Sequence, residues 1–122
     1  MYDIIIKNGV YPDYSQKDFV KSDIAIKDGK IVKIGDITEK ATHTINAAGK
    51  VVSPGFIDIH MHEERFLQNG MKYDIAEYML KMGVTTCLGG NCGSSRQPLS
   101  VFKDIIESLG GSPVNYMMQA VL

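Results

Sequence analysis

The chain has 122 residues, of which 44% are hydrophobic and 22% are charged, which is the make-up of a globular protein with one modest core. Its 13 basic and 14 acidic residues give a net charge of -1 and form no basic patch, which excludes nucleic acid and an anionic membrane surface as expected partners. No apolar run approaches the roughly 18 residues of a membrane span, and the first residues lack the basic start of a signal peptide. We therefore expect a cytoplasmic protein that acts on small molecules.

Residues 1–52 are predicted to form a small β unit. A β-rich opening segment meets a strong turn signal at Asn8-Gly9, and residues 11–21 read as a polar loop. Asp28-Gly29 lies between two β-rich segments of equal length, which favours a tight hairpin with positive φ. A short strand near residues 43–46 completes the unit.

From residue 53 onward the pattern changes to strands that alternate with helices. The expected elements, in chain order, are a strand at 56–62, a helix at 71–82, a strand at 84–88, a helix that begins near Pro98 and ends at Gly110-Gly111, and a strand at 114–122. A β-α-β-α-β order predicts a parallel sheet with helices packed on it.

The first of these strands carries His60 and His62, two imidazoles that an extended backbone would aim at one point. Alternate side chains of a strand share a face, so Asp58 should accompany the histidines while the opposite face packs into a core through Ile57, Ile59 and Met61. Imidazole nitrogens suit Zn²⁺, and the Asp58 carboxylate is a candidate for fixing the tautomer of an imidazole. The alternative is a pair of histidines on a solvated strand face.

Cys92 lies in the glycine-rich turn 90–93, just past the predicted strand 84–88. That edge of a parallel sheet is where α/β folds bind ligands, so the thiolate is a second candidate metal ligand, although a plain steric need for glycine explains the turn equally well. Cys87, in the middle of the strand, is predicted to be a core residue. Glu63 and Glu64 are interpreted as an ordinary acidic loop.

Residues 52–62 resemble the first barrel strand of the metal-dependent amidohydrolase superfamily. The pair of segments 83–86 and 90–93 is similar to the D-aminoacylase (N-acyl-D-amino-acid deacylase) branch, and the resemblance runs over the whole chain. It implies an α/β protein: a β-sandwich-like unit at residues 1–52, followed at residues 53–122 by the first three strands and two helices of an incomplete (β/α)8 TIM-type barrel.

The resemblance also implies a chemistry. His60 and His62 match the paired histidine ligands, Cys92 matches the cysteine ligand that this branch uses, and a complete enzyme would hold one or two Zn²⁺ ions. The implied reaction is hydrolysis of the C–N amide bond of a small N-acyl-D-amino acid, with the metal as Lewis acid. Cyclic-amide amidohydrolases such as dihydroorotases and hydantoinases share the histidine pair and are the alternative, against which the cysteine turn argues.

The chain departs from this family in length. A (β/α)8 barrel needs roughly 250 residues, so we expect a truncated barrel whose later strands, from the same or a second chain, supply further histidine ligands and an aspartate general base. No residue of this chain can be assigned that catalytic role, and the isolated chain is predicted to be inactive. A non-catalytic remnant or interaction module is the other alternative.

Overall fold

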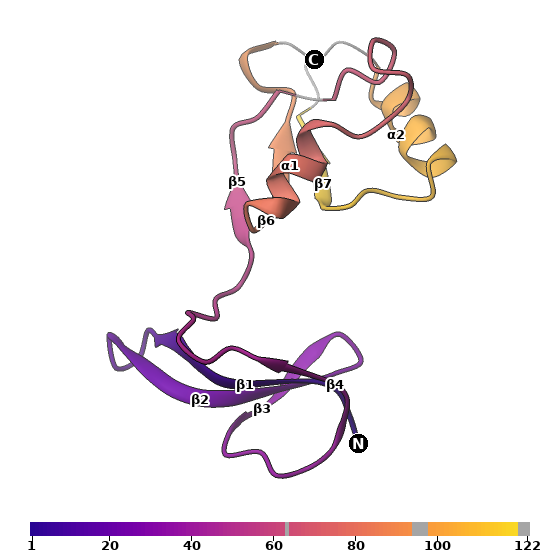
Figure 1. The fold of residues 1–122 in the computed structure, drawn as a ribbon. Helices are drawn as coiled ribbons and strands as arrows, with labels where there is room; N and C mark the ends of the chain where they lie inside the picture. The colour runs from indigo at the N-terminus through magenta and orange to yellow at the C-terminus, as the bar shows by residue number, and fades with distance from the viewer. Residues whose placement is uncertain (63, 94–97, 120–122) are drawn as a thin grey trace. The chain divides into compact units, whose positions relative to one another are not determined.

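The computed structural model describes residues 1–62, 64–93 and 98–119 and divides into two compact units, Met1–Pro54 and Gly55–Leu122 (Figure 1). Within these described ranges, no helix combines the length and the apolar character needed to cross a membrane. Each unit has buried hydrophobic residues of its own, so each is described separately.

The first unit is a four-stranded mixed sheet with the strand order β3-β2-β1-β4 (Figure 1). The strands are β1 (Tyr2–Asp13), β2 (Asp18–Lys27), β3 (Lys30–Gly35) and β4 (Ala41–Asn46). Neighbours along β1, β2 and β3 pair antiparallel, whereas β1 and β4 pair parallel. Ile5, Ala25 and Ile37 form the buried cluster of this unit.

The hairpin predicted at Asp28-Gly29 is confirmed. Asp28 and Gly29 have φ values of 51° and 71°, and they connect Lys27 to its partner Lys30 in a two-residue turn. Positive φ at both central positions matches the right-handed twist of the flanking strands.

The turn predicted at Asn8-Gly9 is wrong, and the loop predicted at residues 11–21 is confined to residues 14–17. β1 continues to Asp13 through an irregularity in its pairing with β2 between Ile6 and Gly9, where Asn8 has a φ of 63°. The local turn signal is real, but it produces a β-bulge because the chain on both sides of it pairs with one strand. Only the short segment between β1 and β2 turns, and there the Asp13 carboxylate accepts hydrogen bonds from Ser15.

The second unit confirms the predicted order of alternating strands and helices. β5 (Phe56–Asp58), β6 (Val84–Gly89) and β7 (Asn115–Met118) form a three-stranded sheet, and both neighbouring pairs are parallel. Helix α1 (Ile75–Lys81) connects β5 to β6, and α2 (Leu99–Ser108) connects β6 to β7 (Figure 1). A short 3-10 turn, η1 (Asn91–Gly93), follows β6.

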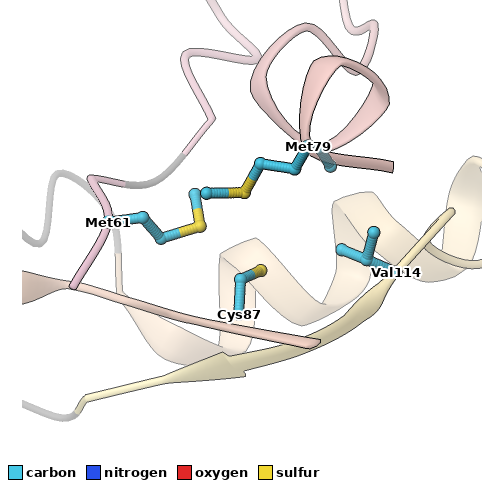
Figure 2. Packing of buried hydrophobic residues seen from close by; sticks show 5 residues of the cluster. Met61, Met79, Cys87 and Val114 are labelled. Carbon is cyan, nitrogen blue, oxygen red and sulfur yellow. The ribbon is translucent and has the colours of Figure 1, made fainter. Parts of the chain in front are cut away.

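Helix α1 packs on the sheet through a sulfur-rich cluster. Figure 2 shows Met61, from the segment after β5, and Met79, from α1, extending toward each other above Cys87 of β6. Cys87 is fully buried, so its predicted place in the core is confirmed. In a second buried cluster, Phe102 and Ile105 of α2 pack with Phe66.

Three expectations for this unit are wrong. β5 ends at Asp58, and Ile57 and Ile59 are 66% and 72% exposed instead of buried, because neither hydrophobic cluster of this unit includes them. Helix α1 begins at Ile75 and not at Met71, because Gly70 and Met71, with φ values of 73° and 58°, are left-handed and cannot belong to it. Met82, the C-cap of α1, is exposed.

Candidate metal centre

The histidine pair follows the carboxyl end of β5. The Asp58 carboxylate accepts a hydrogen bond of 2.9 Å from the backbone N–H of His60, a local turn that ends the strand. Met61 is buried, and its N–H donates to the carbonyl oxygen of Leu88 at 3.2 Å. His60 and His62, on either side of the buried Met61, are both exposed.

This contact gives Asp58 a definite structural role. Its carboxylate shapes the turn through the backbone of His60. The role expected from the sequence, in which Asp58 holds the tautomer of an imidazole, stays a prediction.

Cys92 lies in η1, immediately after the carboxyl end of β6. Its backbone is left-handed, with φ 60° and ψ 23°, and its thiol Sγ lies 3.3 Å from Nε2 of His60. The preceding Gly90 has a φ of 79°, and a Cβ atom there would come within 2.9 Å of the carbonyl oxygen of Gln119. Glycine at position 90 is therefore a steric requirement, as one of the two interpretations of the turn expected. The same turn also places the Cys92 thiol beside His60.

The structure brings together the three ligands predicted from the sequence. One ligand atom from each of His60, His62 and Cys92 lies within 4.8 Å of the other two, and all three residues are exposed. Zinc bond lengths place tetrahedral nitrogen and sulfur ligands about 3.5 Å apart, close to the 3.3 Å between Cys92 Sγ and His60 Nε2. Two imidazoles and a thiolate form a donor set that fits Zn²⁺, and three protein ligands leave a coordination position open.

The second cysteine, Cys87, is fully buried and is not part of this group of ligand atoms. Burial raises the pKa of the Cys87 thiol to about 11, and the negative charges of Asp58 and Glu64 add to the increase. A thiol with this pKa stays protonated at neutral pH, whereas a metal binds the thiolate. Cys87 therefore belongs to the core beneath the site, and Cys92 is the thiol that can bind metal.

Sequence reasoning missed two residues that shape the site. Asn91 is buried, and its side-chain amide donates to the carbonyl oxygens of Met61 and Leu88 at 3.2 and 2.7 Å. Its position beside Cys92 in the turn was the available signal, but its partners are backbone groups of other segments.

Glu64 is the other missed residue, and its interpretation as an ordinary acidic loop is wrong. It is 1% exposed, and its carboxylate accepts hydrogen bonds from the first backbone N–H groups of α1. The donors are Asp74 at 3.0 Å, Ile75 at 3.2 Å and Ala76 at 2.6 Å. Glu63 lies outside the described residues.

The sequence was then compared with known proteins. It is 35% identical over 100 residues to the D-aminoacylase of Alcaligenes xylosoxydans xylosoxydans, a match that covers 81% of this chain and 20% of that protein. It is 39% identical over 97 residues to the D-hydantoinase of Ralstonia pickettii, covering 77% of this chain and 21% of that protein.

A solved structure adds a similarity of fold. It is the N-acyl-D-glutamate deacylase of Bordetella bronchiseptica complexed with zinc and a phosphonate inhibitor that mimics the tetrahedral intermediate of its reaction. The TM-score is 0.66 at 33% identity, over 80% of this chain and 20% of that chain. The present chain thus spans about a fifth of the length of the relatives it matches.

The sequence pattern of a protein family locates the likeness along the chain. The pattern described as Amidohydrolase family matches residues 43–104, which is just over half of the chain and includes His60, His62 and Cys92. Together with the D-aminoacylase and deacylase relatives, this match shows that the chain belongs to the amidohydrolase family.

Proposed function

We propose that His60, His62 and Cys92 bind zinc, as part of the metal centre of an enzyme that hydrolyses the C–N amide bond of N-acyl-D-amino acids. The observation that carries the proposal is the approach of the three ligand atoms to within 4.8 Å of one another. The substrate class is supported by the likeness to D-aminoacylase, and the choice of zinc by the zinc complex of N-acyl-D-glutamate deacylase.

The residues of this chain would hold the ion and shape its surroundings. A bound zinc would supply Lewis acidity, which lowers the pKa of a water molecule and polarises an amide carbonyl. Met61 is buried between the two exposed histidines, and the turn after β6 places the thiol of Cys92 near their ring nitrogens. We assign no general base among the described residues, and we propose that hydrolysis needs groups outside this chain.

We further propose that the second unit is the start of a (β/α)8 barrel. Its three strands are parallel and alternate with helices, and its candidate ligands lie past the carboxyl ends of β5 and β6. TIM-barrel enzymes place their active sites at that end of the strands. In this arrangement the complete enzyme holds one or two zinc ions.

A cyclic amide is the second candidate substrate, because the chain is also similar to a D-hydantoinase. The two candidates are separated by offering N-acetyl-D-amino acids, their L-enantiomers and hydantoins to the natural gene product at its full length. Our proposal predicts release of the free D-amino acid as the preferred reaction. Faster opening of the hydantoin ring would favour the second candidate.

Zinc binding tests the ligand assignment in the 122-residue chain itself. We expect the wild-type chain to retain zinc in equilibrium dialysis. Loss of a residue that only hydrogen-bonds to a ligand weakens metal binding roughly 10–100-fold, so Cys92→Ala, which removes a ligand itself, should weaken zinc binding by more than that. Cys87→Ala is the matched control, since it removes the thiol that is not among the candidate ligands. Equal zinc affinity of wild type and Cys92→Ala would contradict the assignment.

A further inference from the structure

Asn91 connects the two segments that carry the candidate ligands. It follows β6 in the chain, directly precedes Cys92, and is 7% exposed. Its side-chain nitrogen Nδ2 donates to the carbonyl oxygen of Leu88, at the end of β6, at 2.7 Å. The same nitrogen donates to the carbonyl oxygen of Met61 at 3.2 Å.

The Met61 carbonyl is the backbone group between His60 and His62, so this contact acts on both histidines. The backbone N–H of Met61 donates to the same Leu88 carbonyl, at 3.2 Å. Asn91, Met61 and Leu88 therefore form a closed set of three hydrogen bonds, with His60 and His62 on one side and Cys92 on the other. A change in the Asn91 side chain would alter the spacing between the thiol and the imidazoles.

The hydrogen bonds of Asn91 also bear on the backbone conformation of Cys92. With a φ of 60°, Cys92 occupies a region that is unfavourable for a non-glycine residue, and such a conformation persists only where its surroundings impose it. The buried hydrogen bonds of the adjacent Asn91 are surroundings of this kind. They hold the turn in the conformation that brings Sγ to 3.3 Å from His60 Nε2.

We propose that Asn91 is a positioning residue of the metal centre, whose carboxamide sets the spacing of Cys92 and the histidine pair before a metal binds. The inference rests on the proposed metal site and adds a residue that is not itself a ligand. Its chemistry is specific, because both contacts require Asn91 to donate. An aspartate of the same shape would place an oxygen against two carbonyl oxygens.

Cobalt(II) titration tests the inference, because a thiolate bound to cobalt gives a charge-transfer absorption band that reports the Cys92 bond directly. We expect Asn91→Ala and Asn91→Asp to bind cobalt and zinc about 10–100-fold more weakly than wild type, the range for loss of an outer-shell partner. We also expect a weaker band per bound ion in both variants.

Asn115→Ala is the matched control. The Asn115 side chain also donates to the backbone of β6, at the carbonyl oxygen of Thr85 at 3.1 Å, but it is exposed and lies toward the start of the strand. This variant should keep wild-type affinity and a wild-type band.

The zinc-induced rise in Tm, measured for each variant against its own metal-free form, separates positioning from a general loss of stability. If Asn91→Ala does not fold, Asn91→Asp, which preserves side-chain size, carries the test. A wild-type band and a wild-type zinc-induced rise in Tm in the Asn91 variants would overturn the inference while the metal site stands. Absence of any band in the wild-type chain would overturn the proposed metal site, and the inference with it.

Discussion

The buried residue Glu64 connects three segments of the unit that carries the candidate ligands. Its carboxylate caps the first turn of α1, and its own backbone N–H donates to the hydroxyl of Tyr116, which lies in β7, at 3.2 Å. A negative charge at the amino end of a helix also interacts favourably with the helix dipole. Through these contacts the chain that leaves His62 is fixed to α1 and to β7.

We predict that Glu64→Gln lowers the free energy of unfolding by about 2 kcal/mol. The amide oxygen can still accept a hydrogen bond, but the amide nitrogen faces backbone N–H donors that are left without an acceptor. Urea unfolding measures the loss. Glu77→Gln, an exposed change in the same helix, should stay within about 0.5 kcal/mol of wild type, and equal stabilities of the two variants would contradict the capping role.

The candidate ligands could be predicted from the sequence, whereas the residues that support them could not. His60, His62 and Cys92 have the side-chain chemistry that metals require, so their types and spacing are informative. Asn91 and Glu64 act on backbone groups, which every residue has, so their types do not reveal their partners. Only the folded chain shows that a carboxylate caps a helix that begins about ten residues later.

Among the elements, the hairpin turn was predictable from its own residues, whereas the irregularity in β1 was not. The turn at Asp28-Gly29 depends on the backbone preferences of two residues and was predictable. The bulge in β1 depends on Asp23, whose carboxylate accepts a hydrogen bond of 3.0 Å from the backbone N–H of Asn8. Because Asp23 belongs to β2, no local pattern around Asn8 contains that information.

Asp23 supports the first unit through three contacts. Its carboxylate forms an ion pair of 2.8 Å with Lys7 and also accepts the backbone N–H of Ile37 at 3.4 Å. The hydrogen bond from Lys7, followed by that from Asn8, lowers the pKa of Asp23 below its usual 3.8. The charged form is therefore the one that stabilises the sheet.

We predict that Asp23→Asn lowers the stability of the first unit by about 1.5–3 kcal/mol at neutral pH, the range for a hydrogen bond to a charged group. A lowered pKa contributes stability above 3.8 that is lost as the pH falls through the folded-state pKa, so the difference between variant and wild type should shrink in acid. Urea unfolding at several pH values measures this dependence. Asp36→Asn, an exposed neighbour of Ile37, is the control, and a similar loss in both variants would contradict the role of Asp23.

At the scale of the whole molecule, each unit contains a sheet with its own buried cluster, and the candidate ligands belong to the second. In that unit the alternation of strands and helices was predictable, because its periodicity and glycine stops are properties of the sequence. The ends of β5 and α1 were not, because hydrogen bonds from the backbone to the carboxylates of Asp58 and Glu64 decide them. The wrong boundaries of β5 and α1 did not affect the prediction of the candidate ligands.

The central claim is that a thiolate and two imidazoles of this chain bind one zinc ion. X-ray absorption at the zinc edge of the zinc-loaded chain tests it most directly, because sulfur and nitrogen ligands lie at different distances from the zinc ion. We predict one sulfur at about 2.3 Å together with nitrogen or oxygen ligands at about 2.0–2.1 Å, with the sulfur retained in Cys87→Ala and lost in Cys92→Ala. A wild-type spectrum without sulfur, or one whose sulfur survives in Cys92→Ala, would contradict the claim.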